Sequence, residues 1–198
     1  MKEMKQGFTL VELMVVISII SIFSSLATPT YQVTRGQSQG VTTGATKKSL
    51  TQAAQYYELD MGFYPPDVNR GWDPGFERPF PWNPDVEDGS HPSSNPSPGI
   101  NCNHCPDDWI EIINKRWDGP YLKWPSRTAW QGRFHYNIWN TPKNRYGCTV
   151  PAGIYAGAQG DYANRNNVPL AVEEFMIDVG IDDDKCVNGE SQLLLFPL

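Results

Sequence analysis

The sequence has few positive charges and no basic cluster. Its 198 residues include 16 Lys and Arg against 22 Asp and Glu, which gives a formal net charge of −6 and an isoelectric point near 5.0. Sequence-independent binding to nucleic acid depends on clustered Lys and Arg. We therefore predict that the chain has no nucleic-acid partner.

Histidine is also scarce, and the residues of a catalytic centre are hard to find. The three histidines, His91, His104 and His135, lie in segments that are typical of loops or strands. The sequence contains no H-E-x-x-H zinc motif and no glycine loop of the kind that holds phosphate. We therefore predict that the chain is not an enzyme.

Apolar residues are concentrated in the first thirty positions. Residues 8–27 contain one charged residue, Glu12, and as a helix they are about 30 Å long, the thickness of a bilayer core. Lys2 and Lys5 precede this stretch, which favours a cytoplasmic N-terminus and an exported remainder. We predict a single membrane span over residues 8–28. A cleaved signal peptide with a mature start at Thr28 is the alternative.

The start of this stretch carries a specific pattern. Residues 5–13, Lys-Gln-Gly-Phe-Thr-Leu-Val-Glu-Leu, resemble the cleavage and methylation site of type IV prepilins and type II secretion pseudopilins. The resemblance implies a leader of residues 1–7, which a prepilin peptidase removes by cutting between Gly7 and Phe8, and N-methylation of Phe8. It also implies a bacterial inner-membrane protein with a periplasmic head.

Glu12 is costly inside a membrane and needs a partner. Cleavage would give Phe8 an α-amine, which is largely protonated near neutral pH because its ordinary pKa is about 7.7–8.0. Glu12 of an incoming subunit can meet the Phe8 amine of its neighbour at only one axial stagger. We therefore expect Glu12 and Phe8 to set the register of a homopolymer.

Helical spacing of apolar residues continues beyond the membrane span. It predicts an amphipathic stalk over residues 29–62, loosened at Pro29 and ended at Gly62. Glycines recur every fourth position within the stalk, at Gly36, Gly40 and Gly44. They would permit either close helix packing or local unwinding, and the resemblance implies unwinding in filaments.

Residues 63–198 predict a loop-rich head with a small antiparallel sheet, so the fold class is α+β and pilin-like. The head opens with a proline-rich stretch, followed by a short helix near residues 109–113 and a strand over 133–138. Residues 117–124, Trp-Asp-Gly-Pro-Tyr-Leu-Lys-Trp, resemble a head segment of the major pseudopilin of type II secretion.

Four acidic residues near the C-terminus suggest a metal site. They are Asp178, Asp182, Asp183 and Asp184, and they surround Gly180. Calcium prefers several carboxylate and carbonyl oxygens on a flexible loop. Residues 180–182 resemble the Gly-x-Asp part of the calcium loop in major pseudopilins, which implies Asp182 as the first ligand. A solvated acidic loop is the alternative.

The four cysteines all follow the predicted span and would enter an oxidising compartment, where disulfides form. We favour Cys102 with Cys105 and Cys148 with Cys186, although four cysteines allow three pairings. Zinc binding by the C-x-x-C segment needs further ligands and is disfavoured in such a compartment.

The leading functional hypothesis is a structural subunit of a type II secretion pseudopilus that drives protein export. The resemblance implies three partners: further copies of the chain, the prepilin peptidase and inner-membrane assembly proteins. The second hypothesis is a minor pilin or a membrane-tethered head that recognises a protein or a glycan. It depends on the seven tryptophans between Trp72 and Trp139.

Overall fold

The structure, a computed structural model, describes most of the chain beyond the first seven residues. The described residues are 8–68, 71–84, 102–125, 127–145, 148–160, 168–187 and 189–198. The predicted leader, which includes Gly7, and the middle of the proline-rich stretch lie outside them.

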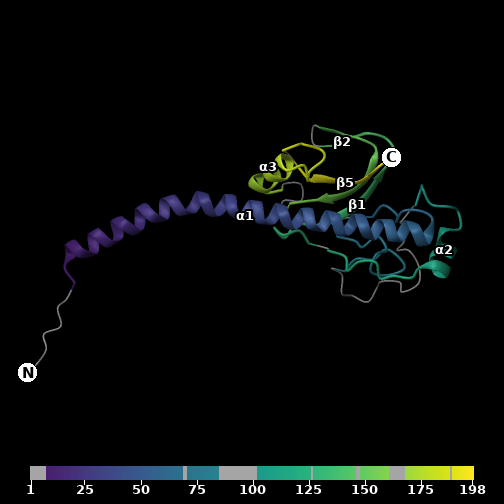
Figure 1. Cartoon of the computed structure of the whole chain (residues 1–198), viewed down its shortest axis with the longest axis horizontal. Helices are drawn as coiled ribbons and strands as arrows, with labels where there is room; N and C mark the ends of the chain where they lie inside the picture. Colours follow the sequence, from purple (N-terminus) through teal and green to yellow (C-terminus); the bar gives the residue numbers. More distant parts are fainter. Residues whose placement is uncertain are drawn as a thin grey trace, which may run out of the picture.

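One long helix dominates the molecule. Helix α1, Leu10–Met61, has 52 residues, and its N-terminal half extends away from a head that surrounds its C-terminal half (Figure 1). The helix is gently curved but unbroken through residue 29, where the sequence predicts a disturbance. It ends at Gly62, which has a φ of 82° and donates its backbone N–H to the carbonyl of Glu58, as predicted.

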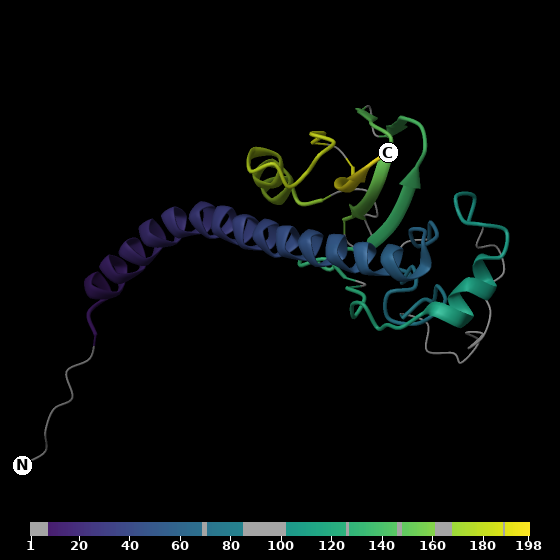
Figure 2. The ribbon, with the colours of Figure 1, turned by 45° about the vertical axis from the view of Figure 1, so that its right-hand side comes forward.

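In its described residues, the head contains two short helices and two small antiparallel sheets. They are arranged along one end of α1 (Figure 2). The helices are α2 (Trp109–Arg116) and α3 (Leu170–Asp178). The larger sheet has the strand order β1 (Phe134–Trp139), β4 (Gly153–Ala158), β5 (Ser191–Pro197). The smaller sheet pairs β2 (Lys143–Arg145) with β3 (Cys148–Val150). The predicted α+β, pilin-like class is confirmed.

The C-terminal half of α1 forms the centre of the core. Leu50, Ala54, Tyr57 and Met61 are spaced by three or four residues, so they share one helix face, and each is at most 1% exposed. Tyr57 contacts the ring of Phe76 edge to face, at 6.4 Å between centroids. Burial of this face holds the head on the helix.

The glycines of the stalk lie where α1 passes closest to α3 and the loop after it. A Cβ atom at Gly36 would lie 2.9 Å from the carbonyl oxygen of Ala171, and one at Gly40 would lie 2.4 Å from the ring of Phe175. Gly44 faces Ile181 in the same way. In the single chain the three glycines therefore permit close packing, while unwinding in a filament stays a prediction.

Candidate functional site

The predicted processing and assembly residues lie at the N-terminal end of α1. Thr9 is the N-cap, and its hydroxyl accepts a hydrogen bond from the backbone N–H of Glu12 at 3.2 Å. In return, Oε2 of Glu12 accepts bonds from the backbone N–H and the hydroxyl of Thr9, each at 2.8 Å. This reciprocal capping box starts the helix. Glu12 therefore has a partner within its own chain that the sequence analysis did not predict.

The surface of α1 that follows this cap is apolar all round and uncovered. Its large apolar side chains from Leu10 to Phe23 are 44–74% exposed. By length and composition, α1 includes one segment able to cross a membrane. Exposed apolar surface of this extent marks a membrane or protein contact. The head covers none of this segment.

The predicted acidic residues do not share one environment. Asp178, at the end of α3, is exposed, whereas Asp182 is buried. The Oδ2 atom of Asp183 accepts bonds from Lys47 Nζ at 2.6 Å and from the backbone N–H of Leu194 at 2.7 Å. Asp183 thus forms an ion pair with the stalk through one of its two carboxylate oxygens.

A third carboxylate, which the sequence analysis missed, joins Asp182 and Asp184. Glu173 on α3 is 2% exposed, and its Oε1 atom and Oδ2 of Asp182 are buried without a hydrogen-bond partner among the described residues. The pKa of Glu173 rises to about 8, chiefly through burial and then through the charges of Asp182 and Asp184. In the sequence, the only indication of Glu173 would have been its position on the inner face of a helix, α3.

Burial and mutual repulsion raise the other two pKa values as well. The pKa of Asp182 rises to about 7, chiefly through burial and then through the charge of Asp184. Burial raises the pKa of Asp184 to about 6, although its Oδ1 atom accepts the backbone N–H of Cys186. We call Glu173, Asp182 and Asp184 the carboxylate cluster.

The carboxylate cluster has the oxygen donors that calcium prefers. The two buried oxygens without partners, on Glu173 and Asp182, fit the role of ligands. Within the described chain, however, no three carboxylates have their oxygens all within 4.8 Å of one another. Backbone carbonyls or water would have to complete such a site. Gly180, with a φ of 70°, ends α3 and turns the chain toward Asp182.

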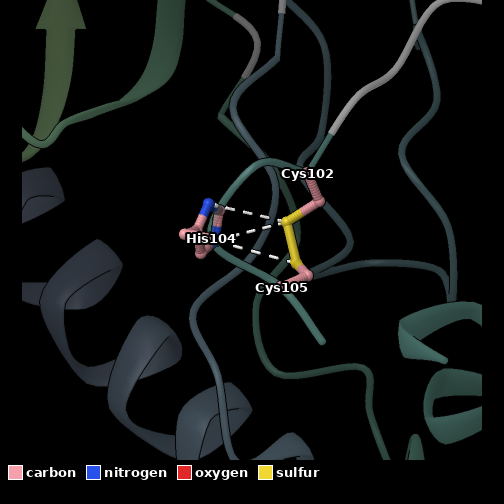
Figure 3. A group of neighbouring side chains, drawn as sticks. All are labelled: Cys102, His104 and Cys105. Carbon is pink, nitrogen blue, oxygen red and sulfur yellow. Dashed lines mark hydrogen bonds between the residues drawn. A yellow bond between two sulfur atoms is a disulfide. The ribbon is translucent and has the colours of Figure 1, made fainter. Parts of the chain in front are cut away.

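The four cysteines form the two favoured disulfides. Cys102 is bonded to Cys105, and Cys148, at the start of β3, is bonded to Cys186 in the acidic loop. The second bond therefore joins the small β2–β3 ribbon to the segment that carries Asp182. His104 lies beside the first disulfide (Figure 3).

The remaining histidine in the described head belongs to a buried polar network. His135 on β1 lies 3.5 Å from Oε1 of Glu190, whose carboxylate also accepts bonds from Gln159 at 2.6 Å and Gln192 at 2.7 Å. The His135 ring is accommodated because Gly157 on β4 has no side chain. The four residues of the network are at most 5% exposed, and Oε1 of Gln192 has no hydrogen-bond partner among the described residues.

One catalytic-looking pattern has no catalytic setting. Residues 36–40, Gly-Gln-Ser-Gln-Gly, match the letters of the G-x-S-x-G motif, but they lie inside α1. That motif requires a sharp turn between a strand and a helix. Ser38 is therefore an exposed residue of the stalk.

The tryptophans do not form an exposed surface on which a glycan or a protein could stack, because all seven are buried or half-buried.

Comparison with known proteins gives matches to part of the chain. Residues 4–28 match the prokaryotic N-terminal methylation motif. The fimbrial protein EcpC of Eikenella corrodens is 40% identical over 70 residues, which are 34% of this chain and 44% of the relative. The type IV major pilin protein PilE of Neisseria gonorrhoeae is 34% identical over 67 residues, 34% of this chain and 40% of the relative. No solved structure matches the chain.

The long helix, the antiparallel head and the methylation motif define a type IV prepilin-like protein. The chain spans less than half the length of each of these curated relatives. The relatives therefore support the family assignment over 34% of this chain. The prediction that the chain is type IV prepilin-like is confirmed.

Proposed function

We propose that the chain is a structural, non-catalytic subunit of a type IV pilin-like filament. A prepilin peptidase would process it, and it would polymerise through α1 from a pool in the inner membrane. The observation that carries this role is the uncovered apolar half of α1, which continues without a break into the helix at the centre of the head. In a membrane, lipid would cover this surface, and in a filament, further copies of α1 would cover it.

Glu12 is suited to move between two sets of partners. Both bonds from Thr9 go to Oε2, so Oε1 remains available for a second donor. Cleavage between Gly7 and Phe8 would create an ammonium group of that kind on each subunit. The helix cap stabilises Glu12 in the single subunit, and the Phe8 amine of a neighbour would add an ion pair on assembly.

Mass spectrometry of the mature N-terminus tests the processing step. We expect a chain that begins with N-methylated Phe8. A mature start at Thr28, or an unprocessed chain, would contradict the proposal.

Filament formation tests the assembly step. Glu12→Val is expected to insert into the membrane but to yield no filaments, whereas Glu111→Val, which removes an exposed carboxylate from α2, should assemble normally. Glu12→Asp keeps the charge on a shorter side chain and should assemble at a reduced rate. Filaments of normal length from Glu12→Val would rule out the register role.

The more specific role that we propose is in a type II secretion pseudopilus. Support comes from the resemblance of residues 117–124 to a head segment of the major pseudopilin. In the source organism, loss of the gene should then abolish secretion of exported enzymes and leave surface pili intact. Loss of pili with normal secretion would instead assign the chain to a pilus, in line with the names of the two relatives.

The alternative role is a minor pilin with a binding head. The number of copies per filament distinguishes the two roles. A structural subunit forms long homopolymers, whereas a minor pilin is present at few copies per filament. Quantitative mass spectrometry of sheared filaments would measure this ratio directly.

We also propose that calcium binds at the carboxylate cluster. The support is the pair of buried oxygens on Glu173 and Asp182 that have no hydrogen-bond donor within the described chain. A divalent cation would neutralise the repulsion that raises the pKa values of these groups.

A further inference from the structure

A tight turn gathers three metal-binding side chains near the start of α2. The turn is closed by a bond from the backbone N–H of Cys105 to the carbonyl of Cys102, at 3.2 Å. Cys102 Sγ lies 3.4 Å from Nε2 and 3.5 Å from Nδ1 of His104, and Cys105 Sγ lies 3.8 Å from Nε2 (Figure 3). Within the described residues, this is the only group of three such side chains whose donor atoms lie within 4.8 Å of one another.

One of these separations matches an edge of a tetrahedral metal site. Zinc binds sulfur at about 2.3 Å and imidazole nitrogen at about 2.0–2.1 Å, so a sulfur and a nitrogen on one ion lie about 3.5 Å apart. The distance of 3.5 Å between Cys102 Sγ and Nδ1 of His104 already has this value. The two sulfur atoms have to move apart when the disulfide opens.

The hydrogen bonding of His104 also suits a ligand. Its Nε2 atom lies 2.9 Å from the backbone carbonyl oxygen of Tyr64. A carbonyl can only accept, so Nε2 carries the proton, and Nδ1, which lies 3.5 Å from Cys102 Sγ, keeps the lone pair that a metal would use. A bond from one ring nitrogen to a backbone carbonyl is the usual arrangement for metal-binding histidines, because it fixes the tautomer and the ring orientation.

The other disulfide lacks such a setting. Neither Cys148 nor Cys186 belongs to a group of three metal-binding side chains in the part of the chain that the structure describes. The two disulfides therefore differ in what their reduced forms can bind, although both are half-buried. The Cys148–Cys186 disulfide therefore serves as an internal control for metal binding by the reduced Cys102–Cys105 pair.

We propose that reduction of the Cys102–Cys105 disulfide converts this turn into a site for Zn²⁺ or a similar borderline transition-metal ion. A dithiol or phosphine reductant supplies two electrons, two protons are taken up, and the S–S bond is replaced by two thiols. Metal binding displaces both thiol protons, and Cys102, His104 and Cys105 provide three ligands. Water completes the tetrahedron. The turn is then held closed either by the disulfide or by the metal.

Cobalt titration of the full chain in detergent micelles tests this site. After reduction with a phosphine, Co²⁺ should bind with thiolate-to-cobalt absorption in the near ultraviolet and tetrahedral bands in the visible, and Zn²⁺ should displace it. The oxidised chain should show neither. Cys148→Ser/Cys186→Ser should retain the bands, Cys102→Ser/Cys105→Ser should lose them, and His104→Gln should weaken binding about 10-fold to 100-fold.

A second measurement avoids dependence on variants that fail to fold. In the reduced wild-type chain, Zn²⁺ should slow alkylation of Cys102 and Cys105 by iodoacetamide and leave Cys148 and Cys186 unprotected, as mapped by peptide mass. Absence of thiolate-to-cobalt absorption in the reduced wild type would overturn the proposal. Equal zinc protection of all four cysteines would overturn it too, because it would show that the metal has no preference for this turn.

Discussion

Lys47 Nζ on α1 lies 2.6 Å from Oδ2 of Asp183, in the loop that follows α3. The same lysine donates to the carbonyl of Ile181 at 3.2 Å, and the same Asp183 oxygen accepts the backbone N–H of Leu194 on β5. One ion pair therefore connects the stalk, the acidic loop and the sheet. It also pairs one carboxylate oxygen of the acidic loop with a side chain of the stalk.

Lys47→Met is expected to lower the free energy of unfolding of the head by about 1–2 kcal/mol. The estimate lies between the values for surface ion pairs and for buried charged hydrogen bonds, because the two side chains are 20% and 29% exposed. Urea denaturation followed by tryptophan fluorescence measures it, since every tryptophan is in the head. Lys48→Met, at the exposed neighbouring position, should change the stability little. Equal effects of the two substitutions would show that the ion pair contributes nothing specific.

Gly40→Ala should destabilise the head, although alanine favours a helix by about 1 kcal/mol over glycine. The new Cβ would lie 2.4 Å from the Phe175 ring, and overpacking of this kind costs about 1–3 kcal/mol. Gly44→Ala is the matched control, because its Cβ would meet the terminal methyl of Ile181, which can rotate away. Thermal melts should place Gly40→Ala below the wild type and Gly44→Ala close to it. A higher melting temperature for Gly40→Ala would show that α3 does not pack tightly on this face.

Much of the fold was predictable where one local signal dominates. The apolar run, the helical spacing and Gly62 fix α1, and the alternation of residues 133–138 agrees with β1. Strand β4 was missed because its sequence, Gly-Ile-Tyr-Ala-Gly-Ala, has no alternation. All six residues are buried, and its two glycines allow neighbouring groups to approach closely.

The candidate sites were predictable only in part, because their partners are distant in sequence. Asp182 was selected from its neighbours in the loop, but Glu173 reaches it from α3, a helix that the sequence analysis did not predict. The pairing of Asp183 with Lys47 spans 136 residues and has no local signal. Thr9 was visible beside Glu12, yet its capping role required the backbone geometry.

The head should become less stable as the pH rises from about 5 to 8. In the folded chain burial raises the pKa of Glu173 from 4.5 to about 8, of Asp182 from 3.8 to about 7 and of Asp184 from 3.8 to about 6. The folded state therefore binds protons more tightly than the unfolded state, and stability is lost as these groups ionise. Each contributes at most about 1.4 kcal/mol per pH unit within its window. Buried Asp73, with a pKa of about 7, acts in the same direction.

Glu173→Gln isolates the contribution of the carboxylate cluster to this pH dependence. The amide resembles the protonated acid, so the variant should match the wild type near pH 4.5 and melt at a higher temperature near pH 8. Glu174→Gln, on the exposed face of α3, should follow the wild-type curve. Melting temperatures across this range, measured in the presence of a chelator, provide the comparison. A wild-type curve that rises toward pH 8 would contradict the assigned direction of the pKa shifts.

Calcium should reverse this loss of stability if the carboxylate cluster binds it. At pH 8 the carboxylates are largely ionised, so Ca²⁺ should raise the melting temperature of the wild-type chain, whereas at pH 5 protons compete and the effect should shrink. At 100 times its dissociation constant the ion would add about 2.7 kcal/mol to the stability. Asp182→Asn removes a charged ligand, so it should be more stable than the wild type without calcium at pH 8 and respond weakly to it. Magnesium, which demands a smaller and more regular shell of ligands, should give a smaller shift. A wild-type melting temperature that is unchanged by calcium at pH 8 would exclude the site, and the buried oxygens of Glu173 and Asp182 would then be neutralised by protons alone.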